Sequence, residues 1–230
     1  MSKRKNLTRK RRTRSRKSLR RLPRRIYKGG GDKINFILTT CINDLNDPVR
    51  KEQYKKGINS VLSYIKNMKN CRIIIVENNG KRPTYLDDFG VDVLYTKNNS
   101  LGNEKGTTEL LDILDCIKAF NIGDDEFVVK MTGRYYLDTS SPFMDELVNL
   151  DASTACIIHY GSYLKSDDIN DCITGLIGMR SKYIQKITRG VNPIEHSWAK
   201  TSHEIPSSKV RVLKTLGIYV CPGSNDYILV

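Results

Sequence analysis

The sequence contains six cysteines but no C-x-x-C pair, and it has only three histidines. The wide separation of the cysteines excludes a zinc knuckle, which needs closely spaced ligands. Most of them lie in apolar runs, as Cys156 does beside Ile157 and Ile158, so we predict buried free thiols in a reducing compartment. The six are Cys41, Cys71, Cys116, Cys156, Cys172 and Cys221. No metal site is predicted.

Two further absences narrow the class of protein. No apolar stretch approaches the ~20 residues that a membrane-spanning helix needs, so we expect no transmembrane segment. Neither G-x-G-x-x-G nor the Walker A pattern G-x-x-x-x-G-K-[ST] occurs in the chain. Their absence counts against a dinucleotide site and against a P-loop ATP site.

Acidic residues are missing from the first 31 positions, which hold 15 lysines and arginines. The rest of the chain holds 24 basic and 25 acidic side chains, so the formal net charge of +14 resides in this N-terminal segment. Because such a segment repels itself and has little to bury, residues 1–31 are predicted to be a disordered basic tail that ends in the flexible hinge Gly29–Gly31. Residues 32–230 are predicted to form one near-neutral folded domain.

The charge of the tail indicates two kinds of partner, nucleic acid or an anionic membrane surface. A solvated tail without a partner is the alternative. No apolar h-region follows the charges, so we predict no secretory signal. We expect a cytoplasmic protein, with the nucleus as the alternative that the basic tail suggests.

The first half of the domain alternates between strands and helices. Apolar runs with the length and β-branching of buried strands occur at 34–42, 72–76, 91–95 and 127–129. Asp47 and Pro48 have the chemistry of an N-cap and a first helical residue. Strands separated by helices imply parallel pairing, so the predicted fold class is α/β, with a mostly parallel sheet flanked by helices.

A second helix is predicted over 104–120, where apolar residues recur at helical spacing. Its acids Asp112 and Asp115 are expected on the outer, solvated face. Beyond the fourth strand we predict helices at 142–150, 181–189 and 193–203, and strands at 155–160, 172–179 and 210–220, the last broken by Gly217.

Polar residues follow each predicted strand of the first half, and in open parallel sheets ligands bind beyond the carboxyl ends of the strands. Hydroxyls, amides and one acid suit a base and a ribose, while lysines and arginines suit a diphosphate that glycines allow the backbone to approach. The predicted nucleotide-binding residues are Thr39, Glu77, Asn78, Asn103, Lys105, Gly106, Thr132, Gly133 and Tyr135.

The stretch FVVKMTGRYYL at 127–137 carries the strongest signal, because Lys130 and Arg134 stand at the mouth of a buried strand. Two cations there are costly unless an anion meets them, although a strand end whose cations reach water is the simpler interpretation. We predict that Arg134 grips phosphate oxygens with its forked guanidinium and that Lys130 acts as a point charge. Thr132 is expected to donate a hydrogen bond and Tyr135 to contact the sugar.

The order of these motifs resembles the GT-A class of nucleotide-sugar glycosyltransferases over residues 34–220. The resemblance rests on the first strand, VENNG after the second, the N-x-K-G stretch that opens a helix, KMTGRYYL, CITGLIGMRSKYI and IEHSW. In that class a strand end usually carries Asp-x-Asp, which holds Mn²⁺ or Mg²⁺ against the diphosphate. Here that position reads Thr132-Gly133-Arg134 and is similar to branches with K-x-[ST]-G-R-Y, so metal dependence stays open.

The resemblance implies a GT-A-like domain that moves a sugar from a UDP- or GDP-linked donor to a glycan or protein acceptor. It implies Glu195 as the base that deprotonates the acceptor; an ordinary first-turn acid is the alternative for this residue. The basic leader with its glycine run is similar to those of proteins from large DNA viruses, which would place the protein in host cytoplasm or a virion. The alternative function is a nucleic-acid-associated or virion protein that acts through its tail, with an inactive α/β domain.

Overall fold

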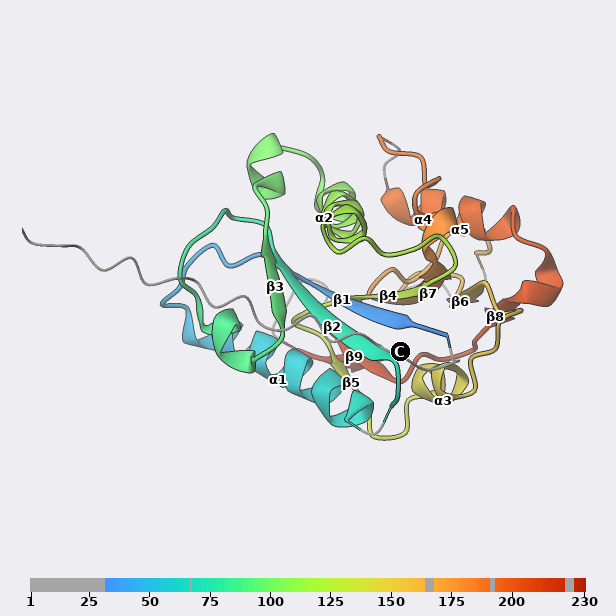
Figure 1. Cartoon of the computed structure of the whole chain (residues 1–230), viewed down its shortest axis with the longest axis horizontal. Coiled ribbons are helices and arrows are strands. Elements are labelled where there is room, and N and C mark those ends of the chain that lie inside the picture. The colour runs from blue at the N-terminus through green and yellow to red at the C-terminus, as the bar shows by residue number, and fades with distance from the viewer. Residues whose placement is uncertain (1–31, 67, 164–167, 191–192, 222–225) are drawn as a thin grey trace, which may run out of the picture.

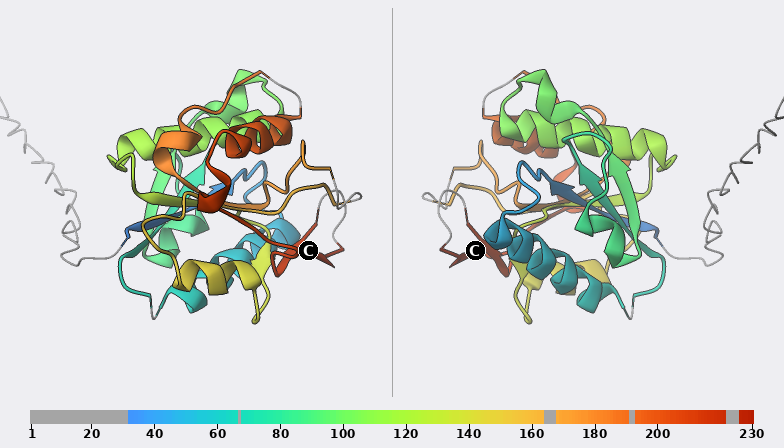
Figure 2. Two further views of the ribbon diagram at one scale, coloured as in Figure 1. Left: turned by 90° about the vertical axis from the view of Figure 1, so that its right-hand side faces the viewer. Right: turned by 90° about the vertical axis from the view of Figure 1, so that its left-hand side faces the viewer.

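The computed structural model describes residues 32–66, 68–163, 168–190, 193–221 and 226–230. The tail predicted for residues 1–31 lies outside these ranges. Figure 1 shows one central sheet with helices above and below it, and the two side views of Figure 2 show the same layers from either end. No helix in the described ranges is long and apolar enough to cross a membrane.

The central sheet contains seven strands in the order β3-β2-β1-β4-β7-β6-β8. Strands β1 to β4 run parallel, in register from Ile34 against Cys71 and Phe127, whereas β7 is antiparallel to β4. The strands are β1 (Ile34–Thr40), β2 (Cys71–Glu77), β3 (Asp92–Tyr95), β4 (Phe127–Thr132), β6 (Cys156–Ile158), β7 (Leu176–Arg180) and β8 (Val210–Val212). The carboxyl ends of β1, β2 and β4 and the start of β7 therefore share one edge, which we call the carboxyl edge.

Helices cover both faces of this sheet (Figure 1). Above it lie α2 (Lys105–Ala119), α4 (Ser181–Ile184) and α5 (Ile194–His203), and below it lie α1 (Pro48–Ile65) and α3 (Pro142–Val148). A small sheet in the order β10-β9-β5 also lies below, formed by β5 (Tyr136–Leu137), β9 (Ile218–Val220) and β10 (Ile228–Leu229). Three short 3-10 helices complete the fold: η1 (Tyr85–Phe89), η2 (Asn98–Leu101) and η3 (Ser207–Lys209).

The helix starts follow the local chemistry of the sequence. The Asp47 side chain accepts a hydrogen bond from the Arg50 backbone N–H at 3.0 Å, and Pro48 occupies the first turn, where a missing N–H costs nothing. At the start of α2, the Glu104 carboxylate accepts from the backbone N–H groups of Gly106 and Thr107. These caps fix where both helices begin at the carboxyl edge.

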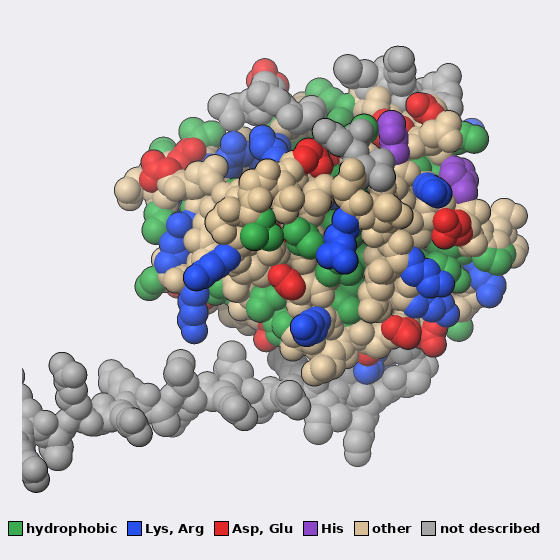
Figure 3. Space-filling model, turned by 90° about the horizontal axis from the view of Figure 1, so that it is seen from above, with side chains coloured by type: hydrophobic (Ala, Val, Ile, Leu, Met, Phe, Trp, Pro, Cys, Tyr) green, Lys and Arg blue, Asp and Glu red, His purple; other side chains and the backbone are tan. Residues whose placement is uncertain are grey.

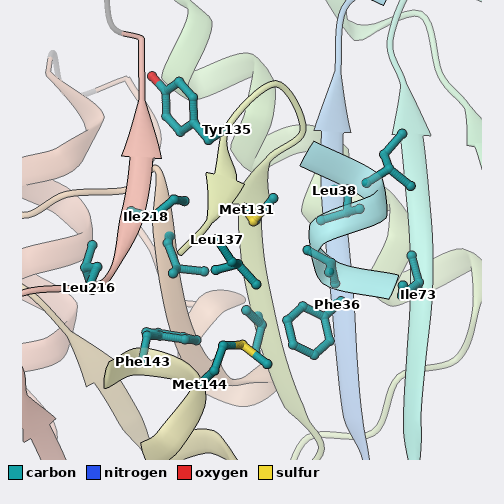
Figure 4. Packing of buried hydrophobic residues seen from close by; sticks show 14 of the residues in the cluster. Phe36, Leu38, Ile73, Met131, Tyr135, Leu137, Phe143, Met144, Leu216 and Ile218 are labelled. Carbon is teal, nitrogen blue, oxygen red and sulfur yellow. The ribbon is translucent and has the colours of Figure 1, made fainter. Parts of the chain in front are cut away.

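Alternating residues of the strands divide the core into two halves. Below the sheet, Phe36, Leu38 and Met131 pack with Leu137, Phe143 and Ile218 from the layer underneath (Figure 4). Above it, Ile37, Ile74 and Val128 pack against α2 and α5. Lys130 and Thr39 continue this upper face at the carboxyl edge, so the sheet pattern places them beneath α2.

Several sequence predictions need correction. The region 210–220 is two strands in different sheets, because Gly217 adopts φ 64° and turns the chain from β8 towards β9. The predicted strand at 172–179 begins at Leu176, and the helix predicted at 181–189 ends at Ile184. Asp112 was expected to face solvent but is fully buried. Asp112 is buried because side chains of the neighbouring loops donate hydrogen bonds to its carboxylate.

The opposite, amino edge of the sheet is fastened by Arg180. Its guanidinium makes two hydrogen bonds of 2.9 Å to the carboxylate of Asp32, just before β1. It also donates to the carbonyls of Asp125, Asp151 and Thr154. All five N–H groups of the buried Arg180 guanidinium therefore have acceptors, and they join four segments at the edge opposite the carboxyl edge.

Candidate active site at the carboxyl edge of the sheet

A buried lysine is the centre of the polar residues at the carboxyl edge. Lys130 is 2% exposed, and its ammonium donates to the Thr132 hydroxyl at 2.9 Å and the Thr174 carbonyl at 2.5 Å and pairs with the Glu109 carboxylate at 2.6 Å. An ammonium has three N–H groups, so these three partners use its whole donor capacity. The lysine is therefore held in place by protein groups alone.

Glu109, on α2, joins this lysine to β1. Its carboxylate accepts from the Thr39 hydroxyl at 2.9 Å and lies 3.3 Å from the Thr132 hydroxyl. Its side chain is 25% exposed, so one side of the carboxylate faces solvent. The positive charge of Lys130 is matched by this acid, which lowers the net charge available to an incoming phosphate.

Glu195 lies on the other side of the same network, in the first turn of α5. The Thr174 hydroxyl donates to its carboxylate at 3.1 Å, and the Thr174 carbonyl accepts from Lys130. The helix dipole favours a negative charge in this first turn. Together, Lys130, Glu109, Thr39, Thr132, Thr174 and Glu195 form what we call the lysine network, which connects β1, β4, α2, the start of β7 and α5.

Two tyrosines border the lysine network. Tyr163 is hydrogen-bonded to Tyr135, and burial is the main cause of the raised pKa of both phenols. The carboxylates of Glu109 and Glu195 add to the raised pKa of Tyr163, so this hydroxyl lies within the field of both acids. A Cβ on Gly175 would lie 2.8 Å from the Tyr135 ring and 2.9 Å from the Tyr163 hydroxyl, so only glycine fits between them.

The turn after β4 directs Arg134 away from the lysine network. Its guanidinium donates to the Cys221 carbonyl at 2.6 Å and to the Cys221 sulfur at 3.2 Å, and the Tyr227 hydroxyl donates to the Arg134 carbonyl. Gly133 makes the turn possible, because a Cβ there would lie 2.9 Å from the Thr39 carbonyl oxygen. Arg134 is half-buried at the lower side of the carboxyl edge.

Glu77 anchors the loop that follows β1. This fully buried carboxylate accepts from the Thr40 hydroxyl at 2.8 Å, from the backbone N–H of Ile42 at 3.1 Å, and from the Asn79 amide at 3.1 Å. The Arg82 guanidinium lies 3.6 Å away. Glu77 therefore accepts hydrogen bonds from protein groups and fixes the conformation of the loops after β1 and β2.

Asp112 gathers the ends of β2 and β3 against α2. Its carboxylate accepts from the Thr96 hydroxyl at 2.7 Å, the Asn98 amide at 2.8 Å and the Asn78 amide at 3.0 Å. Burial raises the pKa of Asp112 to about 6, although the three hydrogen bonds favour its charged form. We call Asp112, Asn78, Thr96 and Asn98 the Asp112 clamp.

The remaining predicted residues lie at the start of α2. Asn103 and Lys105 are exposed, and Lys105 lowers the pKa of the nearby Cys41, against the larger effect of burial, which raises it. Gly106 packs against Ile194 so closely that a Cβ there would overlap the isoleucine side chain. This close approach brings the amino ends of α2 and α5 together above the lysine network.

The structure thus brings together the predicted residues Thr39, Lys130, Thr132 and Glu195, with Tyr135 beside them. Sequence reasoning missed Glu109, Thr174, Tyr163 and the inward position of Asp112. A usable signal existed for the two acids, because positions 109 and 112 share a helix face with Cys116 on the buried side of α2. No short-range pattern singled out Thr174 or Tyr163.

The carboxylates at this edge are poorly placed to hold a divalent metal. Mg²⁺ and Ca²⁺ prefer carboxylate oxygens, and here Glu109 is already paired with Lys130 while Glu195 accepts from Thr174. Within the described ranges no three His, Cys, Asp or Glu residues are grouped so that they could hold a metal ion. The residues after β4 therefore do not fit a metal site made by the protein alone.

Two hollows on the surface lie away from this network. One of about 450 Å³ is lined by Pro48, Val49 and Lys56 on α1 and by Tyr227. Another of about 540 Å³ lies between the end of α5 and β8. From above, acidic and basic side chains are interspersed over the face of α2, α4 and α5 (Figure 3). This mixture agrees with the near-neutral charge of the domain.

No protein-family model matches the chain, and no curated protein matches its sequence. Solved structures do share its fold. S. aureus TarS residues 1–349 align over 79% of this chain and 58% of that one, with TM-score 0.51 and 11% identity. A longer TarS structure gives TM-score 0.52 at 11% identity, over 79% of this chain and 35% of that one. The chain therefore spans little more than half, or less, of these TarS structures.

A protein of Desulfovibrio desulfuricans G20, described as a nucleotide-diphospho-sugar transferase, aligns over 80% of both chains, with TM-score 0.50 and 13% identity. These likenesses establish the fold. The described domain has a GT-A-like fold, a mostly parallel sheet flanked by helices, as the sequence predicted.

Proposed function

We propose that this protein is a glycosyltransferase that moves a sugar from a nucleotide-diphosphate donor to a hydroxyl of a glycan or protein acceptor. The observation that carries the proposal is the position of Glu195. Its carboxylate stands in the first turn of α5 at the carboxyl edge of a GT-A fold, joined through Thr174 to the buried Lys130. In open sheets of this kind, ligands bind at this edge.

In an inverting transfer, the Glu195 carboxylate would take the proton of the acceptor hydroxyl while that oxygen forms a bond to the anomeric carbon of the sugar. The bond from the anomeric carbon to the diphosphate breaks, and its electron pair leaves with the nucleoside diphosphate. The hydrogen bond from Thr174 orients the carboxylate. This geometry supports a base and leaves the stereochemical outcome open.

The leaving diphosphate needs positive charge around it. Arg134 and Lys105 border the carboxyl edge with donors directed at protein carbonyls or solvent, and Arg134 offers a forked grip. Lys130 has no spare N–H, so its contribution is a fixed positive charge that also positions Glu109 and the Thr174 carbonyl. Where a divalent metal takes part, the phosphates would have to provide most of its ligands.

The donor is proposed to be UDP- or GDP-linked, with its nucleoside near Asn78, Glu77 and the amino end of α2. Support comes from the polar ends of β2 and β3, and from the Asp112 clamp that fixes them. Thermal-shift and calorimetric titration with UDP, GDP and their hexose derivatives, each with Mn²⁺ or with EDTA, tests this directly. Failure of every nucleotide to bind the full chain would reject the proposal.

A second candidate function rests on the tail alone. Fifteen cations in residues 1–31 favour binding to a polyanion, and such binding weakens steeply with salt. Electrophoretic DNA-binding measurements over a salt series, with the full chain and with a chain that begins at residue 32, would assign this binding to the tail or exclude it. Binding by both chains alike would contradict the assignment.

A further inference from the structure

The Asp112 clamp joins three segments through one carboxylate that has no cationic partner among the described residues. Asp112 is fully buried on α2, and its three donors are neutral side chains from just after β2 and just after β3. An ionised carboxylate without a cation is costly to bury, so hydrogen bonds alone must hold it.

Backbone hydrogen bonds around the Asp112 clamp show which segments it holds together. The backbone N–H of Thr96 donates to the Glu77 carbonyl at 2.9 Å, and the backbone N–H of Asn99 donates to the Asn78 carbonyl at 3.2 Å. The Asn99 side chain then donates to the Asn79 side chain at 2.7 Å. The loops after β2 and β3 are therefore one connected unit, and Asp112 is the buried residue through which α2 holds both loops, whereas the exposed Asp115 bonds only Asn98.

We propose that Asp112 is a positioning residue that sets the conformation of Asn78 and of residues 96–101 for binding of the nucleotide part of the donor. This inference rests on the proposed function, because the two loops border the edge where the nucleotide would bind. Asp112 itself is buried and touches no ligand. It acts through Asn78 and the 3-10 helix η2.

The orientation of the Asn78 side chain supports this role. Its amide nitrogen donates to Asp112, while its amide oxygen is buried and has no hydrogen-bond partner among the described residues. Only the acceptor at position 112 fixes this orientation, because an amide that turned over would place its oxygen against the carboxylate. Replacing Asp112 by asparagine removes that preference, since either end of Asn78 then finds a partner.

The experiment compares Asp112→Asn with the matched control Asp115→Asn, on the same helix. Asp115 also accepts from the Asn98 amide, at 2.9 Å, but its residue is exposed and bonds neither Asn78 nor Thr96. Thr96→Val is a milder variant that removes the 2.7 Å hydrogen bond to Asp112 and the longer one, 3.5 Å, that the Thr96 hydroxyl accepts from the Asn98 backbone N–H. Amide hydrogen exchange of residues 96–101 reports the loops, and calorimetric titration with UDP and with GDP reports binding.

We expect exchange in residues 96–101 to quicken about tenfold in Asp112→Asn and the Kd of whichever nucleotide binds to rise about tenfold, with changes under about twofold in Asp115→Asn. Thr96→Val should show changes in exchange and in Kd between those of the two aspartate variants. It replaces Asp112→Asn in the test if that variant does not fold. Unchanged exchange in both clamp variants would overturn the positioning role. Faster exchange with an unchanged Kd would overturn the link to nucleotide binding. Faster exchange in a protein whose wild type binds neither UDP nor GDP would leave the loop role standing while rejecting the proposed function and the donor role together.

Discussion

The ammonium of Lys130 and the carboxylate of Glu109 lie 2.6 Å apart, with the lysine side chain 2% exposed and the glutamate side chain 25% exposed. This pair links the end of β4 to α2 directly above the carboxyl edge. It places a permanent internal counter-ion for the lysine at this edge. The charge balance of the site is therefore largely set before any substrate arrives.

Glu109→Ala should destabilise the protein by about 3 kcal/mol, because it leaves the buried Lys130 without its counter-ion. The double variant Lys130→Met/Glu109→Leu should recover much of that loss, since neither charge then remains buried. Urea unfolding measures both. Lys33→Ala is the control, because the Lys33–Glu126 pair is exposed and should contribute less than about 1 kcal/mol. Equal losses in the two single variants would contradict this account.

Arg134→Ala should lower the rate of sugar transfer by about 10²- to 10³-fold while the domain stays folded. The loss of the hydrogen bond to the Cys221 carbonyl should cost only about 1 kcal/mol of stability. Arg134→Lys keeps the charge but not the forked donor geometry, so it should restore part of the rate. Steady-state kinetics with thermal unfolding separates these effects. Full activity in Arg134→Ala would remove this residue from the mechanism.

Glu195→Gln should reduce kcat by about 10²- to 10⁴-fold with little change in donor affinity, because glutamine cannot take a proton but its oxygen still accepts from Thr174. The neighbouring exposed His196 provides the control, and His196→Ala should retain activity. Rate measurements over a range of pH check the assignment. A Glu195→Gln enzyme with wild-type kcat would show that another group is the base.

The stability of the protein should fall with rising pH on account of Asp112. Burial raises its pKa from 3.8 to about 6, so the folded state binds the proton more tightly than the unfolded chain. This contribution is fully present below about pH 4 and is lost as pH rises through about 6. A difference of about two pKa units corresponds to about 3 kcal/mol.

Denaturant unfolding of wild type and Asp112→Asn between pH 4 and 7 tests this sign. Glu109 faces Asp112 from the same helix and raises its pKa further, and Asp112 in turn raises the pKa values of Cys41 and Cys116. Because the other titrating groups are present in both proteins, the difference between the two curves isolates position 112. A difference that does not vary with pH would show that Asp112 titrates normally.

Gly57→Ala should destabilise the domain by about 3 kcal/mol and also lower activity. A Cβ at this position of α1 would overlap the backbone carbonyl oxygens of Gly133 and Tyr135, which form the turn that places Arg134. Gly123→Ala is a fair comparison, because a Cβ there would lie 3.7 Å from the flexible Glu126 side chain. Chemical unfolding of both variants measures the contrast. Equal stability in the two variants would show that α1 can shift to relieve the overlap.

The parallel half of the fold was predictable because it depends on local patterns. Continuous apolar runs predicted β1, β2 and β4, and the pair Asp47-Pro48 predicted the start of α1. The region 210–220 was predicted less well, because Gly217 separates two short strands whose partners are distant in sequence. Strand pairing of this kind depends on tertiary packing rather than on the period of the sequence.

The site shows the same division. Positions after strand ends could be predicted from topology, so Thr39, Lys130 and Thr132 do meet at one edge. The partner of Lys130 could not, because Glu109 lies on a helix whose rotation against the sheet is fixed only by packing. An amphipathic pattern assigns acids to the solvated face of a helix, so the sequence predicts an exposed Asp112. In the structure, three hydrogen-bond donors keep its carboxylate buried.

The fastening of Asp32 by Arg180 has a practical consequence for handling the protein. Strand β1 spans seven residues, so about 20 Å separates this anchor from the opposite end of the strand, where Thr39 meets Glu109. In a chain that begins at residue 32, a purification handle, a fluorophore or a solid support joined at that residue would be anchored at the opposite edge from Thr39 and Glu109. Immobilisation of that shortened chain through residue 32 should accordingly leave the carboxyl edge unobstructed.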